Sequence, residues 1–434
     1  MENAEVYWID LSSKTWDVEQ LDEDTVYKWL GGRGFGLKTL RDDPDAVVIA
    51  RGVLSSVPGI PGRATAYYIS PKTGNIFYSS AGGNVQKMRP FAVVLEGRSE
   101  EKVFLHVTGD GVTFHDAGSF FDANVRETFQ LLEERYPGRV VLATGAFDSE
   151  NAVLANNRHA FFGRGGLGNV LRSRGVKALV IDPLSGSSAP ITPEYMDVLR
   201  GLLAKLKQNS VVAQLTKSGT VGMLLHELGR RGRLPVGLDW ERVLSAWQAF
   251  EKKGHPCAGC PIACKKDFEF WGGFLTFYRD AGTDFHSIAK MYERLNDAGI
   301  DAVAFPVMVS PDDPVYSLAV ETNVRRDQNQ LILTKMWRED LEDVDDPVGY
   351  VISVQDEIAV VDSAVTCGFS LYAWDLDDYS ALLGSLGIEL SSEELREIGG
   401  RIWREELRLA RERGLELHEK NAHVREYLRR RGLL

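Results

Sequence analysis

The chain has 434 residues, of which 44% are hydrophobic, 26% charged and 10% aromatic. These are globular proportions, so they exclude extended disorder and fibrous folds, and the length suggests two to three structural units. Asp and Glu (62) outnumber Lys and Arg (50), which leaves a net charge of −12. This acidic balance argues against nucleic acid as the main partner, because phosphate binding needs a basic face.

The apolar runs are all shorter than the roughly eighteen residues that a membrane span needs, so we expect no membrane association. The first residues, Met1–Glu5, are acidic and lack the basic and apolar regions of a signal peptide. We therefore expect a cytoplasmic protein. In that reducing compartment the four cysteines are poor material for disulfides, so they are either core thiols or a metal site.

Residues 1–185 are predicted to be rich in β-strands. Short runs of β-branched or aromatic residues occur there, each bounded by Gly, Pro, Asn or Asp, which is typical of strands. The predicted strands are Val6–Asp10, Ala46–Ala50, Ala64–Ile69, Phe91–Leu95, Val103–Val107, Arg139–Ala143 and Lys177–Ile181.

Residues 190–434 are predicted to be mostly helical, after a small polar boundary at Leu184–Pro190. Thr192 before Pro193 indicates the capped start of a helix. Ser391, followed three residues later by a glutamate, has the capping-box pattern and predicts the start of the last long helix. The expected fold class is therefore α+β, with a β-rich domain at 1–185 and a helical region at 190–434.

Three of the four cysteines stand close together. Cys257, Cys260 and Cys264 form C-x2-C-x3-C, with a glycine and a proline that suit tight turns, and Cys367 lies far along the chain. A close trio with one distant thiolate is typical of a four-cysteine [4Fe–4S] site. Structural zinc usually takes two cysteine pairs, or cysteines with histidine, so zinc and unrelated core thiols are the weaker alternatives.

A glycine-rich run, Gly163–Gly168, has the literal G-x-G-x-x-G pattern of dinucleotide folds, with Asp182 at the end of the next predicted strand. However, Asn156–Phe162 is not expected to be a buried strand, and only about nine residues follow before the next strand, too few for a crossover helix. We expect the loop to approach another phosphorylated ligand, because bare backbone amides attract anions, with Arg164 as an added positive donor.

Several motifs together point to a family. They are Trp29–Gly36, Pro61–Arg63, Ile69–Gly74, Ser79–Gly83, Glu150–Asn151, Phe162–Gly168, Cys257–Cys264, Asn296–Asp301, and Gln355–Asp356 with Asp362–Cys367. In their order and spacing over most of its length, the chain resembles the tungsten-containing aldehyde:ferredoxin oxidoreductases.

The resemblance implies a β-rich domain that forms the base for a tungstopterin, a bis-molybdopterin with tungsten or molybdenum, with helical domains above it. It implies that the four cysteines hold one [4Fe–4S] cluster beside a pterin and that Arg63 bridges the two cofactors. The other implied cofactor contacts are Gly82, Gly83, Arg164, Gly165, Gly166, Asn296 and Asp362. The implied activity is oxidation of a small aldehyde or related oxo donor to the acid, with electrons passing through the cluster to ferredoxin or a similar acceptor. A homodimer is left open.

The chain departs from the family pattern near the expected chemistry. The segment 301–362 is shorter than in the family, where it normally includes an active-site histidine. Trp271–Tyr278 contains no carboxylate where the family has a glutamate-rich run. Asn296 stands where an aspartate is usual, and Val365 and Thr366 replace Gly and Leu.

Catalytic acid–base residues are therefore left unassigned. Glu269, Asp280 and His286 lie near enough in sequence to be substitutes, because acid–base catalysis needs a titratable group within reach of the substrate. The sequence predicts a shortened enzyme of this family. The alternatives are a cluster-binding electron-transfer or non-catalytic homologue that has lost the pterin chemistry, and, more weakly, an NAD-dependent dehydrogenase.

Overall fold

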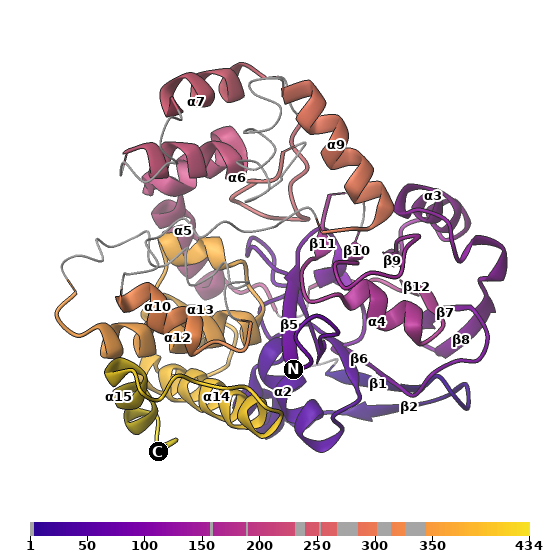
Figure 1. Ribbon diagram of the computed structural model, residues 1–434, viewed down its shortest axis with the longest axis horizontal. Helices are drawn as coiled ribbons and strands as arrows, with labels where there is room; N and C mark the ends of the chain where they lie inside the picture. Colours follow the sequence, from indigo (N-terminus) through magenta and orange to yellow (C-terminus); the bar gives the residue numbers. More distant parts are fainter. Residues whose placement is uncertain are drawn as a thin grey trace.

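The computed structural model describes residues 4–156, 159–187, 190–230, 239–250, 253–266, 285–301, 314–325 and 344–434. Within these ranges all the strands lie between Glu5 and Ile181, and the chain from Pro193 onward is helical (Figure 1). The predicted α+β class is confirmed.

The first sheet has the strand order β2-β1-β6-β3-β4-β5. β1 and β6 are parallel, and the other neighbours are antiparallel. Its strands are β1 (Glu5–Asp10), β2 (Thr15–Gln20), β3 (Val47–Ala50), β4 (Ala64–Ile69), β5 (Ile76–Ala81) and β6 (Ala92–Glu96).

The second sheet has the order β11-β10-β9-β12-β7-β8, with β12 and β7 as its parallel pair. Its strands are β7 (Val103–Thr108), β8 (Gly111–Asp116), β9 (Val140–Thr144), β10 (Leu154–Asn156), β11 (Phe161–Phe162) and β12 (Val176–Ile181).

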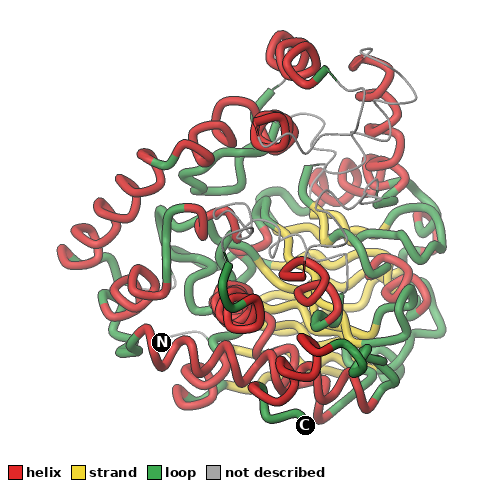
Figure 2. Tube along the Cα trace, turned by 60° about the vertical axis from the view of Figure 1, so that its left-hand side comes forward, coloured by secondary structure: helices red, strands yellow, loops and turns green. Residues whose placement is uncertain are grey.

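The two sheets pack face to face, as the stacked strands of Figure 2 show. Successive strand residues point to opposite faces, so one strand supplies two different cores. In β3, Val47 and Ile49 lie in the core between the sheets, whereas Val48 and Ala50 lie in the core shared with the helices. The central strands of the first sheet are therefore buried on both faces, whereas its edge strand β2 is exposed.

Helices also occur in the β-rich half. They are α1 (Glu23–Trp29), α2 (Gly32–Asp42), α3 (Val125–Arg135) and α4 (Leu167–Ser173), with short 3-10 turns η1 (Val85–Lys87) and η2 (Gly118–Phe120). α2 packs on β3 and β4, and α3 covers β9 on the outer side of the second sheet.

Two helices of the second half begin where the sequence predicted their caps. Thr192 accepts the N–H of Tyr195, and Ser391 forms a reciprocal capping box with Glu394. The described helices of this half are α5 (Pro193–Gln208), α6 (Ser210–Arg230), α7 (Trp240–Ala249), α9 (Phe285–Ala298), α10 (Pro314–Glu321), α12 (Pro347–Ala364), α13 (Leu376–Gly384), α14 (Ser392–Glu412) and α15 (Ala422–Arg430), with the 3-10 turn η5 (Gly368–Tyr372).

The core is continuous between the two halves. α12 packs on both α2 and α14, and one cluster of buried side chains joins the first sheet to these helices. The division into domains 1–185 and 190–434 stays a prediction, since packing does not stop at the boundary. None of the helices in the described ranges is both long and apolar enough to cross a membrane.

The segment before the glycine loop differs from expectation. Asn156 ends the buried strand β10 and Phe161–Phe162 form β11, so strands are present there after all. The short α4 also fits between the glycines and β12, because its first turn uses residues of the glycine run itself. Yet β11, β10, β9 and β12 alternate in direction, so β11 and β12 are antiparallel. A dinucleotide fold needs parallel strands joined by its crossover helix, and this topology argues against the dehydrogenase alternative.

Candidate functional site

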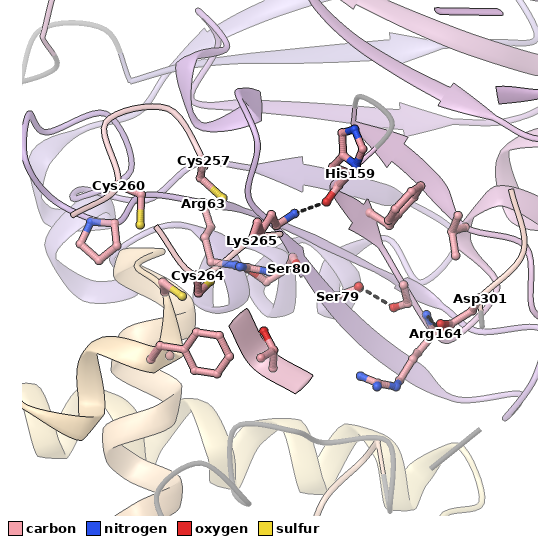
Figure 3. Close-up of a pocket in the computed structure, with 18 of the residues that line it drawn as sticks. Arg63, Ser79, Ser80, His159, Arg164, Cys257, Cys260, Cys264, Lys265 and Asp301 are labelled. Carbon is pink, nitrogen blue, oxygen red and sulfur yellow. Dashed lines mark hydrogen bonds between the residues drawn. The ribbon is translucent and has the colours of Figure 1, made fainter. Parts of the chain in front are cut away.

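All four cysteines line one cavity of about 230 Å³ beside β4 and β5. Other predicted residues along its wall are Arg63, Arg164, Asn296 and Asp362. In Figure 3 the sulfur atoms of Cys257, Cys260 and Cys264 surround one end of the cavity, and Arg164 and Asp301 lie at the other. The structure thus brings together residues from both halves of the chain.

The cysteine trio lies on a tight loop that is hydrogen-bonded to the β-rich half of the chain. Cys260 donates its N–H to the carbonyl of Cys257 at 3.1 Å, and Gly259 between them has a φ of +69°. Ala258 donates its N–H to Gly83 at 2.8 Å. Gln86 in turn donates to the Ala258 carbonyl at 3.0 Å. The loop is therefore anchored through its own backbone, which leaves the thiols to face the cavity.

Gly82 makes room for the first of these cysteines. A Cβ at this position would lie 2.4 Å from the Cys257 Sγ and 3.6 Å from the Arg63 guanidinium. The Gly82 carbonyl accepts a hydrogen bond from the buried amide of Asn156. Gly82 and Gly83 stand behind the cysteine loop and not on the cavity wall itself, so they shape the site through close packing.

Arg63 and Cys367 are held side by side by two strand-like hydrogen bonds. Cys367 donates its N–H to Pro61 at 2.8 Å, and Arg63 donates its N–H to Val365 at 3.2 Å. The Arg63 guanidinium is fixed from behind by Ser80, which accepts a hydrogen bond from Nε at 2.8 Å. This pairing brings the distant cysteine to the trio.

The four cysteines and Arg63 form one corner of the cavity, the cysteine corner, in which the thiols and the guanidinium interact electrostatically. Burial would lower the pKa of Arg63, but the charges of Cys367, Cys257 and Cys264 outweigh burial and raise it. Burial raises the pKa of Cys260 to about 12 and also raises that of Cys367, which Arg63 opposes. Bare thiolates are thus disfavoured here, and a cationic iron centre would supply the compensating charge.

The thiols fit a cluster better than a single metal ion. In the described part of the chain, no three His, Cys, Asp or Glu side chains lie close enough to hold one ion. A structural zinc needs four ligands around one point. In a [4Fe–4S] cluster each thiolate can bind a different iron atom, so wider spacing suits it. The cysteines are all free of disulfides, and their role as cluster ligands stays a prediction.

The glycine loop is held in an unusual backbone conformation. Arg164, Gly165 and Gly166 all have left-handed φ angles of +64° to +76°. A Cβ on Gly165 would lie 2.5 Å from Phe77 and from the Tyr68 hydroxyl, so only glycine fits there. Gly165 and Gly166 lie behind the cavity wall, whereas Arg164 is part of it.

Hydroxyl groups of the first sheet anchor this loop from below. Ser79, Tyr68 and Ser70 donate to the carbonyls of residues 163, 164 and 165 at 2.7, 3.1 and 2.8 Å. From the other side, the Asp301 carboxylate accepts the Arg164 N–H at 2.7 Å. Asp301 belongs to a motif quoted in the sequence, but its role in holding the loop depends on a contact that only the fold creates.

Asp362 belongs to a buried ionic cluster that the sequence did not reveal. Arg33 donates to Glu406 at 3.0 Å through Nε and lies 3.6 Å from Asp362, and its guanidinium is stacked at 4.2 Å between the rings of Tyr78 and Trp403. Burial raises the pKa of Asp362 to about 6, although Arg33 opposes the shift. The motif Trp29–Gly36 was recognised, but the partners of its arginine lie more than 300 residues away.

The proposed acid–base substitutes cannot be placed. Glu269 and Asp280 lie outside the described residues, and so does Trp271–Tyr278. The side chain of His286 is likewise outside the described part of α9.

Comparison with known proteins identifies the family of the chain. Residues 6–183 match the family model "Aldehyde ferredoxin oxidoreductase, N-terminal domain", and residues 316–423 match "Aldehyde ferredoxin oxidoreductase, domains 2 & 3". The tungsten-containing aldehyde ferredoxin oxidoreductase of Pyrococcus abyssi is 25% identical over 92% of this chain and 88% of that protein. That of Pyrococcus horikoshii is 28% identical over 59% of this chain, and the alignment spans only about half of that relative (48%).

One solved structure has a similar fold. It is the active site complex BamBC of benzoyl coenzyme A reductase with 1,5-dienoyl-CoA, with a TM-score of 0.75 over 99% of this chain and 94% of that chain. The sequence identity is 16%, so the likeness concerns the fold alone.

Proposed function

Because the chain belongs to the aldehyde ferredoxin oxidoreductase family, we propose that it is an oxidoreductase that binds one [4Fe–4S] cluster and a tungstopterin. The single observation that supports this best is the meeting of Cys257, Cys260, Cys264 and Cys367 at one cavity with Arg63 beside them. Four thiolates are the usual ligand set of such a cluster.

The pterin, with tungsten or molybdenum, would occupy the cavity between the cysteines and the glycine loop. Arg63 would face the cluster with one side of its guanidinium, which offers planar donors to an anion. Arg164 and Asp362 would contact the pterin from the other end, and Asn296 from the α9 side. When bound, the metal–pterin group would supply the two-electron oxidation chemistry.

The proposed reaction converts an aldehyde and water to a carboxylic acid, two electrons and two protons. The chain's part is to hold the substrate beside the cofactor and to lead electrons away, one at a time, through the cysteine corner. Ferredoxin or a similar one-electron carrier would accept them. The substrate class and the acceptor are taken from the relatives, which are named aldehyde ferredoxin oxidoreductases.

A second candidate is an electron-transfer homologue that binds the cluster without pterin chemistry. The observation that favours it is the absence of any carboxylate in the sequence Trp271–Tyr278, where the family has glutamates. Such a homologue would keep the four cysteines that bind the cluster and would lack the pterin chemistry at the other end of the cavity.

Elemental analysis of protein purified without oxygen separates the two. Tungsten or molybdenum at about one atom per chain, together with iron and sulfide, would support the enzyme. Iron and sulfide alone would support the electron-transfer homologue, and the absence of both would reject the cluster. Cys260→Ser should abolish the brown absorbance, whereas Arg63→Ala should reduce pterin retention and spare the iron; equal loss of both cofactors in Arg63→Ala would contradict the role given to Arg63.

A further inference from the structure

A chain of three buried hydroxyl groups leads from the cavity wall to the backbone of Cys367. Thr366 Oγ1 lies 2.7 Å from the Tyr379 hydroxyl, which lies 2.8 Å from Ser370 Oγ. Ser370 Oγ lies 2.6 Å from the Cys367 carbonyl. Thr366 is 2% exposed, and Tyr379 and Ser370 are fully buried. Water therefore does not compete for these hydrogen bonds, which makes each of them stronger.

The direction of every hydrogen bond follows from counting protons. A hydroxyl carries one proton, and a carbonyl can only accept. Ser370 must donate to the Cys367 carbonyl, so it accepts from Tyr379. Tyr379 has then used its proton and accepts from Thr366. The chain runs one way, Thr366 to Tyr379 to Ser370 to the Cys367 carbonyl.

This arrangement fixes both peptide groups of Cys367. Its carbonyl accepts from Ser370 twice, through Oγ and through the backbone N–H at 2.9 Å. Its N–H donates to Pro61 at 2.8 Å. The thiol of Cys367 is on the cavity wall, and both the backbone N–H of Phe369 and the Arg63 guanidinium are directed at its sulfur. With the peptide held on both sides, the Cys367 backbone is fixed, so its side chain starts from a fixed point and the sulfur meets the Phe369 amide and the Arg63 guanidinium.

We propose that Thr366, Tyr379 and Ser370 are positioning residues that orient the Cys367 thiol and thereby set the reduction potential of the cluster it binds. The proposal rests on the proposed function for the cluster, and on the hydroxyl chain for the orientation. Hydrogen bonds to cluster sulfurs and the orientation of the ligands are among the factors that tune such potentials. The chain has Thr366 where the resemblance leads us to expect leucine. Leucine has no hydroxyl, so it could not donate the first hydrogen bond of this chain, to Tyr379.

The test compares two tyrosine-to-phenylalanine variants. Tyr379→Phe removes the central hydroxyl and leaves the ring. Tyr427→Phe is the matched control, because Tyr427 is also fully buried and its hydroxyl also donates one hydrogen bond, to Gln355, and accepts one, from Arg431, away from the cavity. Both variants should lose a similar amount of thermal stability.

Two measurements address orientation and potential separately. In metal-free protein, Tyr379→Phe should raise the alkylation rate of Cys367 several-fold relative to Cys260, measured by mass spectrometry, and Tyr427→Phe should not. In iron-loaded protein, the ratio of reduced to oxidised cluster at the wild-type midpoint should change several-fold in Tyr379→Phe, which is the scale of one neutral hydrogen bond. Thr366→Val should change both quantities in the same direction and by less.

Each result of these measurements either supports or overturns the proposed role of the hydroxyl chain. An unchanged alkylation rate at Cys367 overturns the proposal, and so does an unchanged midpoint in iron-loaded Tyr379→Phe. Failure of Tyr379→Phe to load iron, with a stability equal to that of Tyr427→Phe, supports it. If the wild-type protein itself contains no iron, the proposed function fails, and the alkylation rates alone decide whether the hydroxyl chain orients Cys367.

Discussion

Gly82→Ala tests how tightly the cysteine corner is packed. The added Cβ would lie 2.4 Å from the Cys257 Sγ, whereas ordinary contacts begin at 3.4 Å, so the sulfur must move by about 1 Å. The φ of Gly82 is outside the left-handed range, so alanine brings no backbone strain. Overpacking of this kind costs about 1–3 kcal/mol. The simplest relief is rotation of the Cys257 side chain away from the cavity.

The expected result is a folded protein with little iron. Iron and acid-labile sulfide, measured after anaerobic purification, should fall well below the wild-type content, and the metal-free protein should lose only a few degrees of thermal stability. Gly201→Ala is the control, because this exposed glycine of α5 has no atom within 4 Å of the new Cβ and alanine favours a helix. Wild-type iron content in Gly82→Ala would refute the assignment of Cys257 to the cluster, and equal loss of iron in both variants would refute the packing argument.

Three further predictions concern the buried residues around the cavity. Burial raises the pKa of Asp362 in the folded protein to about 6, above its usual 3.8, so ionisation of this carboxyl opposes folding. The free energy of unfolding should therefore fall as the pH rises from 4 to 6. Asp362→Asn should reduce this fall by on the order of 3 kcal/mol, measured by urea titration of metal-free protein. Arg33→Met should cost about 3–5 kcal/mol, because it leaves the buried Glu406 carboxylate without its cationic partner. Adding Glu406→Leu should restore part of this loss, whereas additive losses in the double variant would contradict the pairing. Gly165→Ala should lower the melting temperature far more than Gly74→Ala, which has a similar φ and open space around its Cβ; equal effects would show that φ and not crowding limits the loop.

Local patterns predicted much of the fold because their causes are local. The caps at Thr192 and Ser391 form within four residues of the chain, and both are confirmed. Strands such as β4 and β12 were found from short β-branched and aromatic runs. β2, β5, β8, β10 and β11 were not predicted. β2 and β8 are exposed or partly exposed and carry many polar residues, and β10 and β11 are only three and two residues long, so all depend on their neighbours for pairing; β5 is buried and was missed although it begins with the apolar run Ile76–Tyr78.

The glycine loop shows where a pattern misled. Its spacing matched a dinucleotide fingerprint, but spacing does not specify strand direction. The antiparallel order of β11, β10, β9 and β12 comes from pairing along the whole sheet. Left-handed φ at Arg164 is likewise imposed by the anchoring hydroxyls and by Asp301, none of which is adjacent in sequence.

By itself the sequence determined the close spacing of the cysteine trio, the class of the fold and the resemblance to a family, because each depends on residue type and on short or ordered spacing. Only the tertiary structure decided that Cys367 reaches the trio, that Arg33 pairs with Glu406 and that Tyr379 links Thr366 to Ser370. Such contacts join residues brought close by the packing of sheets and helices, and burial there strengthens polar interactions that would be weak in water.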